Sequence, residues 1–341
     1  MESRLGDQIE KHIQGAKRNA ATYNFHGIVT RVYADNHLLA LAIQDFLRPF
    51  RGDPGEEAQI EFYLMEGGSG SPVESLSASG KAQLLYDWQV LRYSSEDQLR
   101  FQEVPGAGSI IADIDAGVAA AFVETDMAAC AWSVAHVIFF PMWAQMLKTR
   151  GLFPVHSAGL VRDGCGILFP GKSNCGKSTM ALKLLQRGFK LLGDDTVFVR
   201  SGGDGVEMLF FPEEVDVCAE TVDLYSQLAL ARTLTEDKWQ PRERVNLREV
   251  GADAVVETAR ADLLVFPVIA EDGVTRYEEV APSAALAELI LYAFLFMDPH
   301  TTRENFNVLA SLVQSVRCYR LYMGLDGDDL RAAVDGIIAA S

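Results

Sequence analysis

The 341-residue sequence lacks several features that would indicate particular classes of protein. Its five cysteines are odd in number and contain no CxxC pair, which argues against a disulfide framework or a zinc site and favours a reducing cytoplasm. Basic residues are scarce, with 30 lysines and arginines against 47 aspartates and glutamates, so that the formal net charge is -17. Because such a surface repels the phosphates of nucleic acids and anionic membranes, we expect neither as a partner.

Long hydrophobic runs are also scarce. Residues 127–147 are mostly apolar and end before Lys148 and Arg150, as a membrane span would. The run contains Ser133 and Pro141, however, and no second run follows, so we interpret it as a buried helix broken near Pro141. Roughly the first 20 residues look helical and lack the apolar centre of a signal peptide, which predicts a cytoplasmic protein with no membrane span.

The remaining pattern divides the chain into two predicted domains, 1–147 and 148–341. In the first, Asn36 is expected to cap a helix over 37–47, and the Gly/Ser-rich stretch at 67–72 is expected to be a loop. Strands are expected at 25–33, 59–65, 83–93, 98–104 and 117–123. This pattern indicates an α+β domain without recognisable chemistry.

The second predicted domain begins with a hairpin. Two apolar runs, 155–161 and 166–169, are joined by an Asp-Gly turn at Asp163. A helix over 177–186 is terminated by Gly188 and followed by a strand. Further along, the pattern predicts a strand at 261–269, a largely buried helix at 283–297, a strand at 318–323 and a closing helix at 328–340.

A phosphate-binding motif, G-x-x-x-x-G-K-[ST], lies between the hairpin and the helix. Its residues, with the one that follows, are Gly171, Lys172, Ser173, Asn174, Cys175, Gly176, Lys177, Ser178 and Thr179. The glycines let backbone N–H groups point at phosphate oxygens, and the following helix adds its positive N-terminus. Lys177 can reach the β- and γ-phosphates, and the Ser178 hydroxyl can ligate Mg²⁺. The motif therefore predicts binding of a nucleoside triphosphate, and ATP with Mg²⁺ is the ligand that we expect.

Two adjacent carboxylates, Asp194 and Asp195, end the strand after the motif helix. Alone, such a pair is more often a turn or a helix cap. Next to a phosphate loop it has a chemical use, because magnesium needs a hard oxygen ligand and transfer to a hydroxyl needs a base. The pair can divide these two tasks.

The segments VHSAGLV and GILFPGKSNCGKSTMALKLLQRGFKLLGDDTVFV resemble the catalytic domain of HPr kinase/phosphorylase and its wider group of related kinases. That group has a histidine in a short strand, a hairpin into the phosphate loop, a helix, and a strand ending in Asp-Asp. The resemblance is specific over 153–200 and weaker beyond it, and residues 1 to about 145 do not match the N-terminal domain of the typical enzyme. It implies an α/β fold with a mixed sheet, shared with phosphoenolpyruvate carboxykinase, and phosphorylation of a serine hydroxyl.

The resemblance also implies residue roles. Lys177 and Ser178 hold nucleotide and metal, and Asp194 is the base. Asp195 supports metal or acceptor, and His156 lies beside the carboxylates. The family's later signature, with its further glutamate and phosphorolysis loop, is not found, so HPr as acceptor and the reverse reaction are not implied. Lys238, Arg242 and Arg244 lie in about that region, either facing a phosphate or on an exposed charged loop.

These observations predict an ATP-dependent kinase that phosphorylates a hydroxyl, serine first, of a peptide, protein or small molecule, with the first domain selecting the acceptor. The alternative is a nucleotide-binding regulatory or assembly module with slow hydrolysis or none; the retained Asp194 favours the kinase. A third hypothesis, a carboxykinase-like phosphoryl transfer to an enolate, needs additional basic and metal-binding side chains around the substrate, and too few of these can be assigned in this sequence. Neither an ABC signature nor a guanine-binding N-K-x-D motif is present. Whether the chain forms a homo-oligomer is left open.

Overall fold

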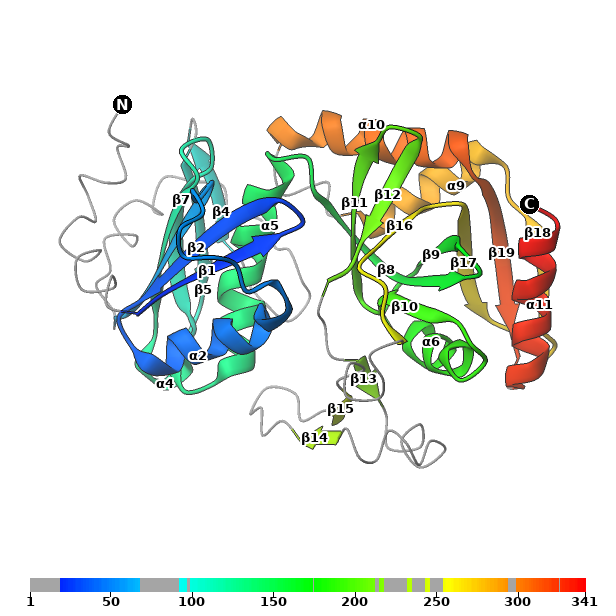
Figure 1. Ribbon diagram of the computed structural model, residues 1–341, viewed down its shortest axis with the longest axis horizontal. Helices are drawn as coiled ribbons and strands as arrows, with labels where there is room; N and C mark the ends of the chain where they lie inside the picture. The colour runs from blue at the N-terminus through cyan, green and yellow to red at the C-terminus, as the bar shows by residue number, and fades with distance from the viewer. Residues whose placement is uncertain are drawn as a thin grey trace. The chain divides into compact units, whose positions relative to one another are not determined.

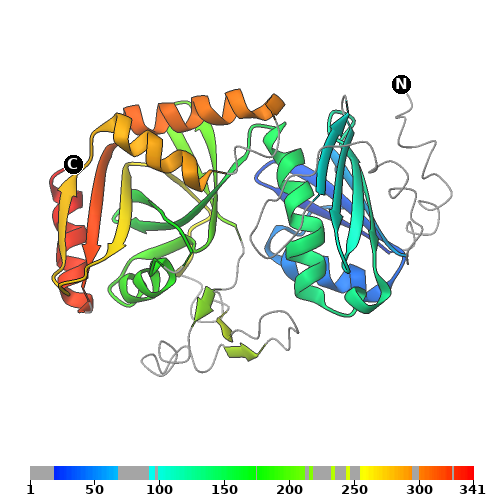
Figure 2. The same ribbon diagram turned by 180° about the vertical axis from the view of Figure 1, so that it is seen from behind.

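The computed structural model describes residues 19–67, 92–96, 99–173, 175–211, 215–217, 232–234, 243–245, 254–293, 299–324 and 326–341. The chain divides into two compact units, Met1–Arg150 and Gly151–Ser341. Each contains its own β-sheet, as two opposite views show (Figure 1, Figure 2). Within the described ranges, no helix is both long and apolar enough to cross a bilayer.

The first unit is built on a seven-stranded mixed sheet in the order β1-β2-β3-β7-β6-β5-β4. The β2–β3 and β3–β7 pairs are parallel, and the other pairs are antiparallel. The strands are β1 (Asn19–Phe25), β2 (Ile28–Ala34), β3 (Ile60–Glu66), β4 (Arg92–Glu96), β5 (Leu99–Val104), β6 (Gly108–Asp113) and β7 (Val118–Val123).

One expectation for this sheet was wrong, and one strand was missed. The single strand predicted over 25–33 is the end of β1, a turn and most of β2, because His26 and Gly27 take positive φ values of 50° and 95° and reverse the chain. Strand β6 was not predicted at all. The expected N-terminal helix and the 67–72 loop fall almost wholly outside the described residues, and Asn19 and Ala20 already belong to β1.

The helices of this unit follow the sequence signals closely. Helix α2 (His37–Phe46) begins after Asn36, whose side chain accepts a hydrogen bond from the Leu38 N–H at 2.7 Å, as predicted. The apolar run lies in the short helix α4 (Thr125–Ala128), the π-helical segment η2 (Ser133–Phe139) and α5 (Phe140–Lys148).

The expected break near Pro141 was wrong, because η2 passes directly into α5 through Phe139 and Phe140, which both keep right-handed helical angles. Pro141 lies in the first turn of α5, where the chain changes from π- to α-helical hydrogen bonding. Trp143 of α5 is fully buried and donates to the Thr30 Oγ1 at 2.9 Å, which ties the helix to the sheet. The apolar run therefore forms part of the core of the first unit.

The second unit contains a nine-stranded mixed sheet with the path β16-β12-β11-β8-β9-β17-β19-β18, and β10 pairs with β8. Strand β17 is parallel to β9 and β19, whereas the other pairs are antiparallel. The strands are β8 (Phe153–Arg162), β9 (Cys165–Pro170), β10 (Lys190–Gly193), β11 (Thr196–Gly202), β12 (Gly205–Leu209), β16 (Thr258–Arg260), β17 (Leu263–Ile269), β18 (Arg276–Glu279) and β19 (Arg317–Met323).

Three short strands form a separate antiparallel sheet, with β15 in the centre. They are β13 (Val215–Val217), β14 (Arg232–Leu234) and β15 (Glu243–Val245). Arg244 belongs to β15, while Lys238 and Arg242 lie outside the described residues.

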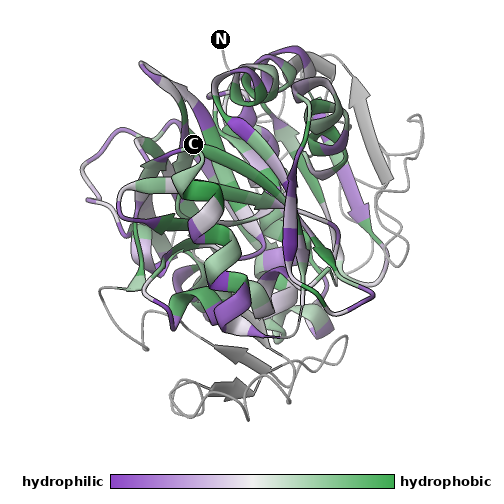
Figure 3. Cartoon of the chain, turned by 90° about the vertical axis from the view of Figure 1, so that its right-hand side faces the viewer, coloured by the Kyte–Doolittle hydropathy of each residue, from purple (hydrophilic) through white to green (hydrophobic). Residues whose placement is uncertain are grey.

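Helices cover both faces of the large sheet (Figure 1, Figure 3). On one face, α6 (Lys177–Leu185) and α11 (Gly327–Ala339) pack on apolar side chains of β8, β9, β17 and β19, which include Leu160, Phe169 and Val265. On the other lie α9 (Pro282–Leu289), the 3₁₀ turn η5 (Ile290–Tyr292) and α10 (Pro299–Ser315). The sheet is thus enclosed, as the green colour of its central strands in Figure 3 reflects.

The helix predicted over 283–297 is shorter than expected. It ends in η5, and Ala293 is extended, because its backbone forms an antiparallel bridge with Val155 of β8. Helix α10 was not predicted, since its first half, PHTTRENF, is polar and shows little apolar periodicity.

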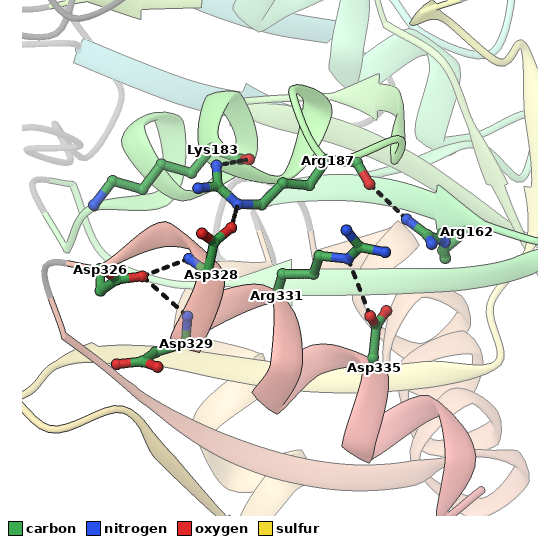
Figure 4. Close-up of polar contacts among 8 residues, drawn as sticks. All are labelled: Arg162, Lys183, Arg187, Asp326, Asp328, Asp329, Arg331 and Asp335. Carbon is green, nitrogen blue, oxygen red and sulfur yellow. Dashed lines mark hydrogen bonds and ion pairs between the residues drawn. The ribbon is translucent and has the colours of Figure 1, made fainter.

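A polar cluster joins the end of α6 to the start of α11 (Figure 4). The Arg187 Nε donates to the Asp328 Oδ1 at 2.8 Å, and the Arg162 guanidinium donates to the Arg187 carbonyl at 2.6 Å. Asp326 caps α11 by accepting from the backbone N–H groups of Asp328 and Asp329 at 2.6 and 3.1 Å. The exposed Arg187–Asp328 pair by itself adds little to the free energy of folding. Together, however, these contacts orient α6, which begins at the phosphate loop.

The cap of α2 gives a test of the first unit. We expect Asn36→Ala to lower the free energy of unfolding by about 1 kcal/mol, because the Leu38 N–H loses its acceptor. Asn36 also contacts the Glu66 carboxylate through its amide nitrogen. Asn36→Ser removes that contact but keeps a capping oxygen, so it should retain most of the stability in urea denaturation. An alanine variant as stable as the serine variant would contradict the capping role.

Candidate active site

The phosphate loop runs from the end of β9 to the start of α6, in the strand–loop–helix order that the motif requires. Gly176 caps α6 with a left-handed φ of 90°, and a Cβ there would lie 3.3 Å from the Met323 Cε. At Gly171 a Cβ would lie only 2.7 Å from the Cys175 Sγ. Gly176 is therefore required by its backbone conformation, and Gly171 is favoured by the close approach of the Cys175 side chain.

The other loop residues differ in exposure. Lys172 and Ser173 are exposed, Cys175 is buried, and Ser178 and Thr179 are half-buried in the first turn of α6. Asn174 lies outside the described residues. The loop thus presents its first residues and the start of α6 to a ligand.

Lys177 is 5% exposed, and its ammonium group is held inside the loop. The Nζ atom donates to the carbonyl oxygens of Gly171 at 2.8 Å and Lys172 at 3.0 Å, and it lies 3.1 Å from the Nε2 of His156. A buried ammonium needs such partners, because an unpaired charge is costly to remove from water. The phosphates of a nucleotide would offer stronger, oppositely charged partners.

Strand pairing brings His156 and Asp195 to this lysine. In the β8–β11 pair His156 lies opposite Thr196, the residue after Asp195, and in the β8–β9 pair Ser157 lies opposite Pro170, the residue before the loop. The Nδ1 of His156 is 3.0 Å from the Asp195 carbonyl oxygen and 3.3 Å from its Oδ1. If Nδ1 carries the proton and donates to that carbonyl, Nε2 is left to accept from Lys177.

The two adjacent carboxylates occupy different environments. Asp194 is 3% exposed, whereas the Asp195 side chain is 61% exposed. In the described part of the chain, no group of three or more His, Cys, Asp and Glu side chains is arranged to hold a metal ion. The oxygen donors of the predicted metal site are the Ser178 hydroxyl and the Asp195 carboxylate, both of the hard type that Mg²⁺ prefers.

The electrostatic setting of His156 favours its neutral form. Burial lowers the pKa of His156 from its ordinary value of 6.5, the Asp195 carboxylate opposes that shift, and the Lys177 ammonium adds to it. A neutral imidazole can accept the hydrogen bond from Lys177, whereas a protonated imidazole would place two cations in contact.

Comparisons with known proteins support the resemblance seen in the sequence. The chain is 43% identical over 62 residues to the HPr kinase/phosphorylase of Geobacillus sp. (strain WCH70), covering 18% of this chain and 20% of that one. It is 46% identical over 43 residues to the Exiguobacterium sibiricum enzyme, with 13% and 14% covered. To the Geobacter sulfurreducens enzyme it is 41% identical over 64 residues, with 18% and 20% covered. These matches relate the chain to the HPr kinase/phosphorylase family.

The relation is partial. The matched part amounts to between 14% and 20% of the length of these HPr kinase/phosphorylases, and no model of a protein family matches the chain. Among solved structures, the HPr(Ser) kinase/phosphatase from Coxiella burnetii has a TM-score of 0.30 and 15% identity, over 55% of this chain and 88% of that one.

One residue at the loop was missed in the sequence. Tyr292 of η5 lies near the loop, because the Lys172 backbone N–H and Cys175 are among the groups that influence its phenol, and the next residue, Ala293, bridges Val155. Burial raises the pKa of Tyr292, the nearby Glu288 and Cys175 add to this, and Arg320 and the Lys172 N–H oppose it. No local signal identifies this tyrosine, because tertiary folding alone brings it to the loop.

The pKa of His156 leads to a test of stability against pH. Because the pKa is below 6.5 in the folded chain, the unfolded chain takes up this proton first as the pH falls, and the folded state loses stability below about pH 6.5. The His156→Gln variant has no titratable group at this position, so its stability does not change with the protonation of residue 156. We expect the difference in unfolding free energy, wild type minus variant, to shrink between pH 7.5 and pH 5.5 in urea denaturation. A constant difference would show that His156 keeps its ordinary pKa.

Proposed function

We propose that the chain is an ATP-dependent kinase that transfers the γ-phosphate to a hydroxyl, serine first, of a peptide, protein or small molecule. The observation that carries the proposal is the gathering of the Lys177 ammonium, His156 and Asp195 at the phosphate loop, with Asp194 directly before Asp195 in the chain. The relation to HPr kinase/phosphorylases supports it, since those enzymes are named for phosphoryl transfer. We also propose that 148–341 is a catalytic domain of the carboxykinase-like type and that 1–147 selects the acceptor.

Each residue has a role that its position suits. Lys177 exchanges its two carbonyl partners and His156 for the β- and γ-phosphates, while the loop N–H groups and the start of α6 bind the remaining oxygens. Ser178 and Asp195 would hold Mg²⁺, which supplies neutralisation of charge on the transferred group. Asp194 takes the proton from the acceptor hydroxyl, and His156 orients Asp195 and Lys177.

The second candidate function is a nucleotide-binding regulatory module with little or no transfer activity. The observation that favours it is that the Lys177 ammonium already has three hydrogen-bond partners within the protein, two loop carbonyls and His156. Both functions use the same nucleotide site, so they differ in the need for Asp194 and not in the need for Lys177.

Nucleotide binding should therefore depend on Lys177 under either function. We expect Lys177→Ala to weaken MgATP binding well beyond about tenfold in calorimetry, because the cation nearest the terminal phosphates is lost. Lys183→Ala is the matched control, since it removes the same charge from the same helix at a residue near the α6–α11 cluster (Figure 4). If both variants bind MgATP like wild type, the loop is not the nucleotide site.

Phosphoryl transfer should depend on Asp194 more than binding does. With labelled ATP, magnesium and lysate of the host, wild type should label a specific species. The label should be stable to acid and labile to base, as that of phosphoserine is.

Asp194→Asn should still bind ATP, while its turnover falls by about 10²- to 10⁴-fold, the scale of general-base removal. Asp163→Asn, an 86% exposed carboxylate in the β8–β9 turn, is the control and should leave turnover unchanged.

The other outcomes separate the alternatives. Acid-labile label on histidine or a carboxylate would contradict serine as acceptor and leave the nucleotide site intact. Slow hydrolysis without any labelled acceptor would favour the regulatory module. Undiminished turnover of Asp194→Asn, with loss in Asp195→Asn, would transfer the base role to the exposed carboxylate.

A further inference from the structure

Strand β17 carries a row of apolar side chains on the face that α6 covers, and this row ends in an exposed residue. Leu263 and Val265 belong to the core beneath α6, and Pro267 is buried as well. Ile269 is the next member of the row, because side chains on one face of a strand repeat at every second position. It is nevertheless 57% exposed. The apolar surface of the core thus continues into solvent at the carboxyl end of β17.

This exposed end lies against the phosphate loop. A Cβ placed on Gly176 would lie 3.8 Å from the Ile269 Cγ1 and 3.3 Å from the Met323 Cε, so both side chains border the residue at which α6 begins. The helix therefore covers the earlier members of the row and leaves Ile269 uncovered. A single exposed isoleucine is ordinary on a protein surface, whereas one that borders a phosphate loop is placed to touch a ligand.

The backbone around Ile269 is fastened to the neighbouring strand. Ile269 lies opposite Met323 in the parallel pairing of β17 with β19. The Ala270 N–H donates to the Met323 carbonyl oxygen at 2.9 Å, and the Gly324 N–H donates to the Thr275 Oγ1 at 3.0 Å. Ile269 is thus held in position without a ligand, and a preformed surface loses little conformational entropy when it is covered.

The contacts of Lys177 distinguish two sides of the loop. Its ammonium group, which reaches the β- and γ-phosphates in this motif, lies beside His156 of β8. Ile269 and Met323 lie on the other side of β9, because the strand order is β8-β9-β17-β19. A triphosphate with its terminal phosphate at Lys177 would therefore extend its sugar and base toward the carboxyl ends of β17 and β19. Ligands of open α/β sheets bind outside such strand ends.

We propose that Ile269, flanked by Met323, is the apolar surface on which the nucleoside of the bound nucleotide packs. The proposal rests on the nucleotide site proposed above and assigns the part of that site that binds the sugar and base. A nucleobase has flat apolar faces, and contact between one of them and the exposed isoleucine removes apolar surface of both partners from water. The nucleoside then supplies affinity that the phosphates alone lack.

The test compares binding of MgATP with binding of magnesium tripolyphosphate, which has three phosphates and no nucleoside. We expect Ile269→Ala to weaken MgATP binding about five- to tenfold in calorimetry, because apolar contact with the nucleoside is lost. Binding of magnesium tripolyphosphate should change by less than about twofold, since the groups that hold phosphates are untouched. Ile269→Leu keeps the apolar surface and should retain the affinity for MgATP to within about twofold.

Phe306→Ala is the matched control. Phe306 is a 41% exposed apolar side chain of α10, on the face of the sheet opposite α6, so its removal should leave both affinities unchanged (Figure 1). Equal weakening of both ligands in Ile269→Ala, unchanged binding of both, or an equal loss of MgATP affinity in Ile269→Leu would overturn the inference. If wild type binds neither ligand, the proposed function fails together with it. If Lys177→Ala weakens MgATP binding while Ile269→Ala does not, the inference fails alone.

Discussion

Strand β8 is paired along both of its edges, and this pairing sets the geometry of the whole candidate site. Its partner β9 leads into the phosphate loop, and its partner β11 begins just after Asp195. Because strand register has a period of two residues, a slip of one position would turn His156 to the other face of the sheet. Backbone pairing of β8 with β9 and β11 thus brings His156 beside the loop and Asp195, where side-chain contacts then join His156 to Lys177 and Asp195.

The buried ammonium of Lys177 is the second constraint. It is satisfied by neutral partners, two carbonyl oxygens and an imidazole nitrogen. Neutral acceptors stabilise a cation less than phosphate oxygens do, so under the proposed function the ammonium would exchange them for the phosphates of the nucleotide. The same logic explains the environment of His156, because a second positive charge beside Lys177 would oppose the first and the ring is kept neutral by burial.

The two units achieve stability by different means. In the first, aromatic rings gather between the sheet and α5, with Trp143 in contact with Phe25 and Phe139 and anchored by its hydrogen bond to Thr30. In the second, aliphatic side chains of α6 and α11 fill the space over the central strands, and the polar cluster of Figure 4 fixes the helix ends. Both arrangements bury apolar surface, while the second also orients the helix that begins at the phosphate loop.

Features that depend on neighbouring residues could be predicted from the sequence. Asn36 caps α2, Gly188 ends the α6 region with a φ of 87°, and Gly171 to Ser178 forms the loop, because each of these is decided within one or two turns of chain. The local pattern predicts a continuous strand at the β1–β2 hairpin, and this prediction is wrong because His26 and Gly27 form a turn with positive φ values.

Which of these residues come into contact depends on the tertiary fold. The His156 ring and the Asp195 carbonyl are 39 positions apart in sequence and are joined by the register of β8 with β11. Helix α10 could not be predicted, because its polar first half is helical although it shows no apolar periodicity. Tyr292 lies near the loop, and the next residue, Ala293, bridges Val155. The physical reason is the same in each case, since pairing between distant strands and burial against a sheet depend on the whole fold and leave no periodic mark in the residues that they bring together.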